Sequence, residues 1–361
     1  MGRKSYKALI VVFCCLVSCV KDKPAVNNIP ASSNIGNVYV VCEGRFGNGE
    51  ATLYTYNRTT DSAFGDLYKS VNNQQLGDVF QSMTKIGGDF FLCVNNSDKV
   101  VVLNAATLVY AGMISVPKPR YILDISPTKA YVSSEYHNKV YVFNPQTLQV
   151  TDSITFPYQN TEGMCLYNNT AFICAWDTTC NSIFKVDVNT DQVIQTIQVA
   201  GYAPQEALLD KEQTLWVLSG AVLSFDPYDG RPCAWTRIDP SSGDMLASYH
   251  FTAEENVVHP VFNNTKDTLY FIEANQSPFP GNNGIYRMGI HDGALPSQPF
   301  VAPLTNQYFW ALGIDPVNAH IYVGDPKGFV QRGSVYVFKQ DGTAIDTFNV
   351  GIGPGHFYFD Q

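Results

Sequence analysis

Large aromatic residues occur in the polar segments of this chain together with amides and a few charged groups. Rings cover apolar surface, whereas amides and charges hydrogen-bond, so this mixture suits capture of a large polar ligand with apolar faces. The candidate binding residues are Arg45, Phe46, Gln81, Arg120, Tyr136, Glu162, Trp176, Glu206, Tyr228, Trp235, Phe279, Trp310 and Phe329. Alternatives stay open, because Arg120 and Glu162 could form a structural ion pair and the tryptophans could pack in a core.

Seven copies of a short apolar strand position these candidates. The copies are residues 38–42, 90–93, 130–133, 171–174, 215–218, 269–272 and 321–324. Their starts lie about 40 to 55 residues apart, which is the spacing of four-stranded propeller blades. Companion strands flank each copy, and turns rich in Asn, Asp and Pro follow them. The sequence therefore predicts an all-β fold, a seven-bladed β-propeller of four-stranded blades with minimal helix.

The two ends of the predicted propeller complement each other. Residues 353–359 resemble an innermost strand without the rest of its blade, and residues 37–71 lack an innermost strand. Pairing the two would close the ring and cover two strand edges. In such a ring, the loops into the innermost strands and the loops between second and third strands share one face. The candidate residues lie in or beside these loops.

The N-terminus is typical of a targeting segment. Three basic residues precede an apolar run at 8–17, which is too short to span a bilayer. The run leads into a sequence that resembles a bacterial lipobox, with Cys19 as the residue that receives the lipid. We expect a lipoprotein signal peptide at 1–18, a flexible tether with lipidated Cys19 at 19–35 and the propeller at 36–361. An ordinary cleaved secretory signal is the alternative.

Charge and cysteine usage exclude some functions. The formal net charge is −9, and the first 18 residues hold three basic and no acidic residues, so the remainder is still more acidic. Without a basic stripe for phosphate contacts, we expect no nucleic-acid partner and membrane contact by the lipid anchor only. Cys42, Cys93 and Cys174 end the apolar strand in three repeats. This regularity favours small buried side chains, with a Cys174–Cys180 disulfide as the alternative.

Motifs for catalysis or metal binding do not occur in a suitable context. The sequence has no CxxC, His-rich spacing, nucleophile elbow, P-loop or dinucleotide fingerprint of that kind. Asp78, Glu162 and Glu206 could converge like the calcium ligands of lactonase-type propeller enzymes, although nothing in their spacing requires it. We therefore expect a non-catalytic protein with no catalytic residue, no metal and no cofactor.

Several segments carry a family resemblance over residues 36–361. These segments are 76–83, 95–99, 119–121, 129–133, 161–164 and 351–355. With them the chain resembles the YncE-like, YVTN-type seven-bladed propeller lipoproteins of Gram-negative outer membranes, which include a cell-surface cobalamin-binding group. The resemblance implies an outer-membrane lipoprotein, facing the cell exterior, that captures vitamin B12 or related corrinoids and passes them to a TonB-dependent transporter. Binding of a glycan or a partner protein in nutrient uptake is the alternative.

Overall fold

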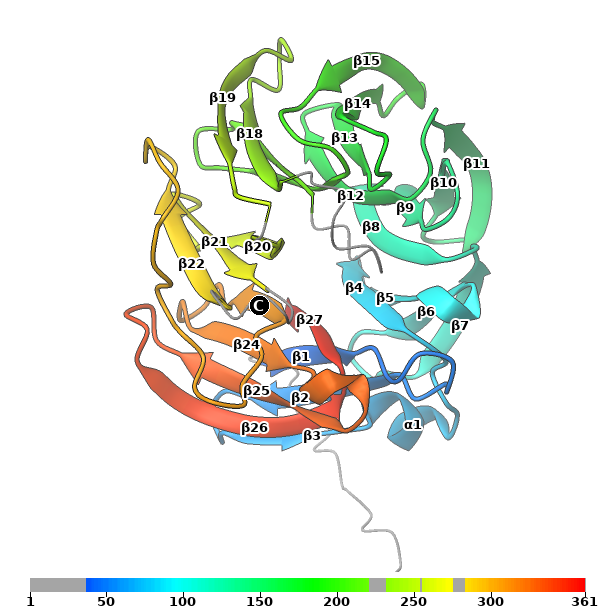
Figure 1. Cartoon of the computed structure of the whole chain (residues 1–361). Helices are drawn as coiled ribbons and strands as arrows, with labels where there is room; N and C mark the ends of the chain where they lie inside the picture. Colours follow the sequence, from blue (N-terminus) through cyan, green and yellow to red (C-terminus); the bar gives the residue numbers. More distant parts are fainter. Residues whose placement is uncertain (1–36, 221–231, 254, 275–282, 361) are drawn as a thin grey trace, which may run out of the picture. The chain divides into compact units, whose positions relative to one another are not determined.

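The computed structural model describes residues 37–220, 232–253, 255–274 and 283–360. Their strands form seven antiparallel sheets around a common centre (Figure 1). Each innermost strand touches the innermost strand of the next sheet, in the closed order β4, β8, β12, β16, β20, β23, β27 and back to β4. The predicted seven-bladed β-propeller is therefore confirmed.

Six of the seven sheets run outward from the centre in chain order, and in the seventh the C-terminal strand β27 lies inside β1, β2 and β3. The innermost strands are β27 (Pro354–Phe359), β4 (Phe80–Ile86), β8 (Pro119–Ser126), β12 (Thr161–Tyr167), β16 (Pro204–Leu209), β20 (Val257–Phe262) and β23 (Ala311–Ile314). The second strands are β1 (Asn37–Cys42), β5 (Asp89–Val94), β9 (Lys129–Ser134), β13 (Thr170–Ala175), β17 (Leu215–Ser219), β21 (Thr268–Glu273) and β24 (Ile321–Asp325). The third strands are β2 (Thr52–Asn57), β6 (Lys99–Asn104), β10 (Lys139–Asn144), β14 (Ser182–Asp187), β18 (Ala234–Ile238), β22 (Gly284–Gly289) and β25 (Arg332–Phe338). The outermost strands are β3 (Ser62–Phe64), β7 (Tyr110–Ser115), β11 (Gln149–Thr155), β15 (Gln192–Gln198), β19 (Met245–His250) and β26 (Ala344–Ile352).

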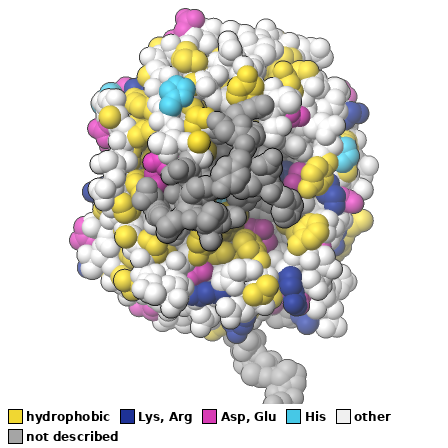
Figure 2. All heavy atoms as spheres, in the orientation of Figure 1, with side chains coloured by type: hydrophobic (Ala, Val, Ile, Leu, Met, Phe, Trp, Pro, Cys, Tyr) yellow, Lys and Arg dark blue, Asp and Glu magenta, His cyan; other side chains and the backbone are white. Residues whose placement is uncertain are grey.

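Two faces of the ring follow from this order. On one of them, the innermost strands begin and the second strands end, and we call it the upper face. The innermost strands end on the opposite, lower face. In Figure 2, hydrophobic side chains lie in small separate groups among polar atoms, which is ordinary for a protein surface.

The C-terminal strand closes the ring. Strand β27 pairs antiparallel with β1, with Val40 opposite Phe357, and so completes the sheet that β1 begins. The Asp360 N–H adds a hydrogen bond of 3.1 Å to the Asn37 carbonyl. The predicted closure is confirmed, and the innermost edge of β1 is covered.

Second strands are buried because each sheet packs between two others. Strand β17 is buried along its whole length, and its Trp216 is fully buried, as expected for a core residue. Cys42, Cys93 and Cys174 are fully buried free thiols. Cys180 is also free, so no Cys174–Cys180 disulfide forms in this structure.

The sheet of β20, β21 and β22 differs from the prediction of four strands. Its fourth strand is reduced to a single bridge between Ile285 and Val301. Pro296, Pro299 and Pro303 lie around this bridge. Proline has no N–H to donate to a ladder, so a longer outer strand is disfavoured here.

Helical structure is minimal among the described residues, as predicted. It consists of α1 (Leu67–Asn72) and two short 3₁₀ turns, η1 (Asn95–Ser97) and η2 (Lys327–Phe329). Helix α1 begins at Asp66, whose carboxylate accepts a hydrogen bond from the Lys69 N–H. Within the described part of the chain, no helix has the length and apolar character that crossing a membrane requires.

Candidate functional site

Most innermost strands begin with a β-bulge at the upper face. In six of the seven, the register with the second strand shifts within the first residues of the strand. A bulge leaves residues unpaired and turns their side chains in new directions. The residues without a cross-strand partner are Gln81, Arg120, Tyr121, Glu162, Gly163, Gln205, His259, Pro260 and Gly355. Much of the polar set that the sequence indicated therefore sits on bulges.

A second irregularity recurs directly before five of these strands. The preceding residue has a φ between 43° and 64° in each case; these residues are Val79, Lys118, Asn160, Ala203 and Gly353. This left-handed conformation is rare for non-glycine residues and rarest for β-branched ones. Each of the five carbonyls accepts a hydrogen bond of 2.7–3.1 Å from the residue after a second strand, namely Asn95, Glu135, Trp176, Gly220 and Glu43 respectively. These hydrogen bonds hold the start of an innermost strand against the end of the second strand in the same sheet, and so fix where the bulged residues lie.

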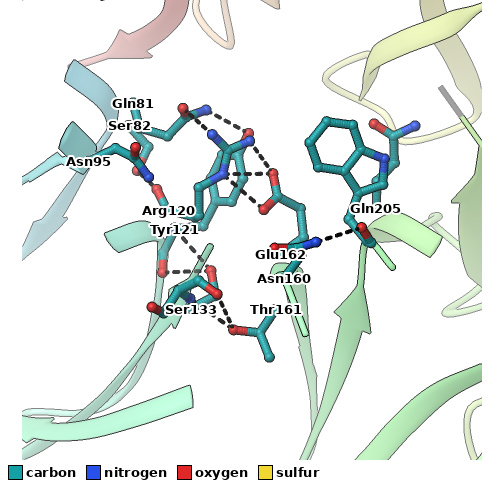
Figure 3. Close-up of polar contacts among 12 residues, drawn as sticks. Gln81, Ser82, Asn95, Arg120, Tyr121, Ser133, Asn160, Thr161, Glu162 and Gln205 are labelled. Atoms are coloured by element: carbon teal, nitrogen blue, oxygen red, sulfur yellow. Dashed lines mark hydrogen bonds and ion pairs between the residues drawn. The ribbon is translucent and has the colours of Figure 1, made fainter. Parts of the chain in front are cut away.

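The bulges bring four polar side chains from three sheets into one cluster. The Arg120 guanidinium donates through Nε to both oxygens of Glu162, at 3.0 and 2.9 Å (Figure 3). Its Nη1 donates to Gln81 Oε1 at 2.5 Å, and Gln81 Nε2 donates to the Tyr121 hydroxyl at 3.2 Å. Burial raises the pKa of Glu162, while the charge of Arg120 opposes this rise. The ion pair that the sequence left as an alternative is present.

Two further carboxylates lie at the upper face, and neither has a cationic partner in contact among the described residues. The Glu206 carboxylate lies against Gly163 of the neighbouring sheet, where a Cβ would be 2.6 Å from Oε2. The Glu43 carboxylate lies against Gly355 and accepts a hydrogen bond of 3.4 Å from Trp310 Nε1. Glycine at 163 and 355 therefore makes room for a carboxylate.

Burial dominates the titration of both carboxyls. Burial, helped by the charge of Glu162 and opposed by that of Arg120, raises the pKa of Glu206 to about 8. Burial also raises the pKa of Glu43 to about 7, against the opposing effects of Trp310 and Arg120. Because Arg120 acts on both groups, the two carboxyls belong to one electrostatic environment.

Aromatic rings lie beside Glu43. The Trp310 ring centroid is 5.2 Å from that of His259 and 5.8 Å from that of Phe329, in edge-to-face geometry. The Phe329 ring also packs against Gly353. Burial, together with His356 and Arg120, lowers the pKa of His259 to about 4, so this imidazole is neutral at pH 7.

Trp176 and Gln205 are joined through one backbone carbonyl. Trp176 Nε1 and Gln205 Nε2 donate to the Gly220 carbonyl at 3.3 and 2.8 Å. Asn160 Nδ2 in turn donates to the Trp176 carbonyl at 3.3 Å. The Trp176 side chain is thus held at the upper face, half-buried, close to the bulge that carries Glu162.

The structure brings six of the predicted residues to the innermost part of this face and places others farther out. The six are Gln81, Arg120, Glu162, Trp176, Glu206 and Trp310, and Phe329 contacts the last of them. Phe46 and Tyr136 are 75% and 64% exposed on their loops, and Arg45 pairs with Glu50 at 3.0 Å. Tyr228, Phe279 and the lipidation residue Cys19 lie outside the described residues.

Trp235 requires a correction. It was expected at the end of a loop and in contact with ligand, but it lies within β18 and is fully buried. Its ring packs against Trp216 and Phe271, with centroids 6.2 Å away in both cases. Trp235 is therefore a core residue.

Glu43 is the main site residue that sequence reasoning missed. It directly follows the second strand β1, as Trp176 follows β13 and Glu135 follows β9. Comparing this equivalent position across the repeats would have revealed it.

The carboxylates do not form a metal centre within the described ranges. No three His, Cys, Asp or Glu side chains there are grouped so as to hold a metal ion. Asp78 uses its Oδ2 to accept hydrogen bonds from the Gly47 N–H and from Asn96 Nδ2, and no ion-pair or hydrogen-bond partner joins it to Glu162 or Glu206 among the described residues. The calcium arrangement considered from the sequence is therefore not what these residues form.

A buried carboxyl beside the site predicts a dependence of stability on pH. Glu273, at the end of β21, is 1% exposed, and its Oε2 has no hydrogen-bond partner among the described residues. Burial, helped by Glu255, raises its pKa from 4.5 to about 8. A folded pKa above the unfolded value means that the stabilising contribution is complete below pH 4.5 and is lost as pH rises toward 8.

Replacing Glu273 with glutamine should remove this loss. Relative to wild type, E273Q should gain up to about 1.4 kcal/mol of unfolding free energy per pH unit across that window. Urea denaturation at pH 5 and pH 8 measures the difference, with the exposed Glu50→Gln as the charge-matched control. An equal effect of E273Q at both pH values would contradict the prediction.

Comparisons with known proteins agree with the fold. Residues 36–360 match the family described as "Domain of unknown function (DUF5074)". No curated protein matches the chain in sequence. A "Quinonprotein alcohol dehydrogenase-like protein" from Bacteroides thetaiotaomicron is 16% identical, with a TM-score of 0.65 over 90% of this chain and 78% of that chain.

Two other solved structures are similar at the same level. Hydrazine synthase from Kuenenia stuttgartiensis is 16% identical, with a TM-score of 0.58 over 75% of this chain and 86% of that chain. The computationally designed protein Ika8 is 12% identical, with a TM-score of 0.58 over 89% of this chain and 91% of that chain. At these identities the likeness concerns the fold alone, whereas the family match spans nearly the whole sequence. The chain belongs to the DUF5074 family.

Proposed function

We propose that this chain is a non-catalytic binding protein whose upper face captures a large ligand with apolar faces and a hydrogen-bonding edge. The observation that carries the proposal is that bulged strands hold polar side chains beside aromatic rings on one face. Arg120, Gln81 and Glu206 supply donors and acceptors, and Trp310 and Trp176 supply rings. Rigid strands position all of them, which is the arrangement that precise binding needs.

Vitamin B12 or a related corrinoid is the ligand that we propose. A corrinoid has a large flat ring system with amide side chains at its edge, so it matches rings beside hydrogen-bonding groups. The family resemblance read from the sequence supports the same ligand. It also supports an outer-membrane lipoprotein, anchored through Cys19 and facing the cell exterior, that passes the ligand to a TonB-dependent transporter.

Isothermal titration calorimetry with cyanocobalamin tests the ligand. We expect one site, with a Kd in the micromolar range or below. Glycans of similar size should give no heat. Absence of heat with cyanocobalamin would reject the corrinoid, and heat with a glycan instead would assign the upper face to carbohydrate capture.

Replacing Trp310 with alanine should weaken cyanocobalamin binding by about 1–3 kcal/mol, the usual cost of losing an aromatic hot spot. The melting temperature should change little, because Trp310 is only half-buried. The control is Trp235→Phe, which alters a core tryptophan and should lower the melting temperature with unchanged affinity. The opposite pattern would show that the Trp310 ring serves packing instead of binding.

A further inference from the structure

We infer that the upper-face site selects its ligand by charge, with Glu206 and Glu43 favouring a cationic or neutral group and excluding an anionic one. The inference deepens the proposed function, because it concerns the ligand class of the same site. It does not depend on the ligand being a corrinoid.

The first step is that the cation of the site is already neutralised. Arg120 Nε and Nη2 donate to Glu162, and Nη1 donates to Gln81. The Arg120 and Glu162 side chains are only 14% and 4% exposed. A guanidinium in this geometry has its charge matched by a carboxylate, so it offers little to an incoming anion.

The second step is that the remaining charge is negative above about pH 8, where both carboxyls have lost their protons. The Glu206 carboxylate lies against Gly163 and makes no hydrogen bond or ion pair with another described residue. The Glu43 carboxylate has one donor, Trp310 Nε1, at 3.4 Å. Of the described residues that act on the pKa of these two carboxyls, Arg120 alone is cationic.

Other titratable groups around Glu206 add no positive charge at pH 7. Those that interact with it are Glu162, Arg120, Tyr121 and Cys174. Burial raises the pKa of Tyr121 and of Cys174, so both are neutral. The imidazoles of His259 and His356 are neutral as well, because burial lowers the pKa of each to about 4.

The third step is that the rings also favour a cation. Tyr121 already has the Arg120 guanidinium carbon 5.7 Å from its ring centroid. Trp310 is half-buried beside Glu43. The face of an aromatic ring attracts positive charge, and a nearby carboxylate adds to this attraction. The Glu43 and Glu206 carboxylates, which have few hydrogen-bond partners, therefore combine with the Trp310 ring to define a site for an organic cation.

A fixed-charge series of probes tests the inference on the full-length protein. Benzyltrimethylammonium, benzyl alcohol and benzoate share one ring and differ in charge. Titration by NMR or calorimetry at pH 9, where Glu43 and Glu206 are ionised, should show the cation binding at millimolar concentration or below, roughly tenfold more tightly than the alcohol, with benzoate weakest. Benzoate binding as tightly as the cation, or no binding of the cation, would overturn the inference.

Variants then assign the selectivity to its residues. Glu206→Gln should reduce the advantage of the cation roughly tenfold, whereas Glu206→Asp, which keeps the charge, should retain most of it. Glu50→Gln removes the same charge from an exposed loop position and should change nothing. Equal effects of E206Q and E50Q would contradict the assignment. Melting curves identify any variant that fails to fold, and E43Q provides a second, independent removal of charge.

The pH dependence supplies a further readout. Since the probe's charge is fixed, its affinity should rise between pH 6 and pH 9 as Glu43 and Glu206 lose their protons, given pKa values of about 7 and 8. A flat profile in wild type would contradict a role for these carboxyls. If cyanocobalamin fails to bind but the cation binds with this profile, charge selection stands and the corrinoid assignment falls.

Discussion

Replacing Asp315 with asparagine is expected to lower the free energy of unfolding by about 3–5 kcal/mol, the typical cost of leaving a buried charge without its partner. Asp315 follows β23 on the lower face and is fully buried, with its Oδ2 2.5 Å from Arg58 Nε. The Arg58 guanidinium also donates to the Asp360 carbonyl at 3.3 and 3.4 Å. The pair thus ties the β23 sheet to the closing strand, and guanidinium chloride denaturation measures its loss.

Two controls separate the buried charge from a general effect. The Lys211 and Asp267 side chains form an exposed ion pair and are 45% and 35% exposed. Lys211→Gln breaks this pair and should lower the free energy of unfolding by at most about 1 kcal/mol. Adding Arg58→Met to D315N removes the stranded guanidinium and should restore part of the stability. A D315N protein as stable as the Lys211 variant would show that the buried pair contributes little.

The fold could be predicted from the sequence because its signal is repeated. Seven apolar strands at regular spacing leave few alternatives to a ring, and the incomplete blades at 37–71 and 353–359 indicated its closure. The sheet of β20, β21 and β22 departs from the repeat, because Pro296, Pro299 and Pro303 prevent a regular outer strand there. The blade pattern is recognised from features that most copies share, so it does not show which copy lacks a regular outer strand.

The site was only partly predictable, because its geometry depends on backbone irregularity and on contacts distant in sequence. Val79 and Lys118 are not residues that suggest a left-handed conformation, yet both adopt it before a bulge. The Arg120–Glu162 pair spans 42 residues of sequence. Trp235 was misplaced because loop length does not show where a strand resumes and its side chain becomes buried.

Closure and the site are physically linked. Glu43 follows β1, and its carboxylate lies against Gly355 of the closing strand. Its N–H also donates to the Gly353 carbonyl at 2.8 Å. One of the two carboxylates that we place in charge selection is therefore positioned by the last strand of the chain. A change that disrupts the pairing of β27 with β1 should consequently displace Glu43 in the binding site as well as destabilise the core.

Deleting residues 354–361 is expected to abolish cooperative folding. The deletion removes β27, whose Phe357 and Phe359 contact Tyr322 on one side while Tyr358 contacts Phe90 on the other, at centroid distances of 5.3–6.0 Å. The core would lose the buried Phe357 and the half-buried rings of Tyr358 and Phe359 that pack against it, and a single Phe→Ala change in a core already costs about 3–5 kcal/mol. The exposed edge of β1 would also favour aggregation.

Circular dichroism melting and size-exclusion chromatography measure this outcome. The truncated chain should show no cooperative transition and should elute as aggregate, because the lost burial and the lost β27 pairing are together comparable with the usual stability of about 5–15 kcal/mol. A chain ending at Asp360 is the matched control, since it keeps every β27 pair and the Lys85–Asp360 ion pair at 2.9 Å. A truncated protein that is monomeric and melts sharply would contradict the argument, because a six-stranded inner ring with an open edge would then be sufficient for folding.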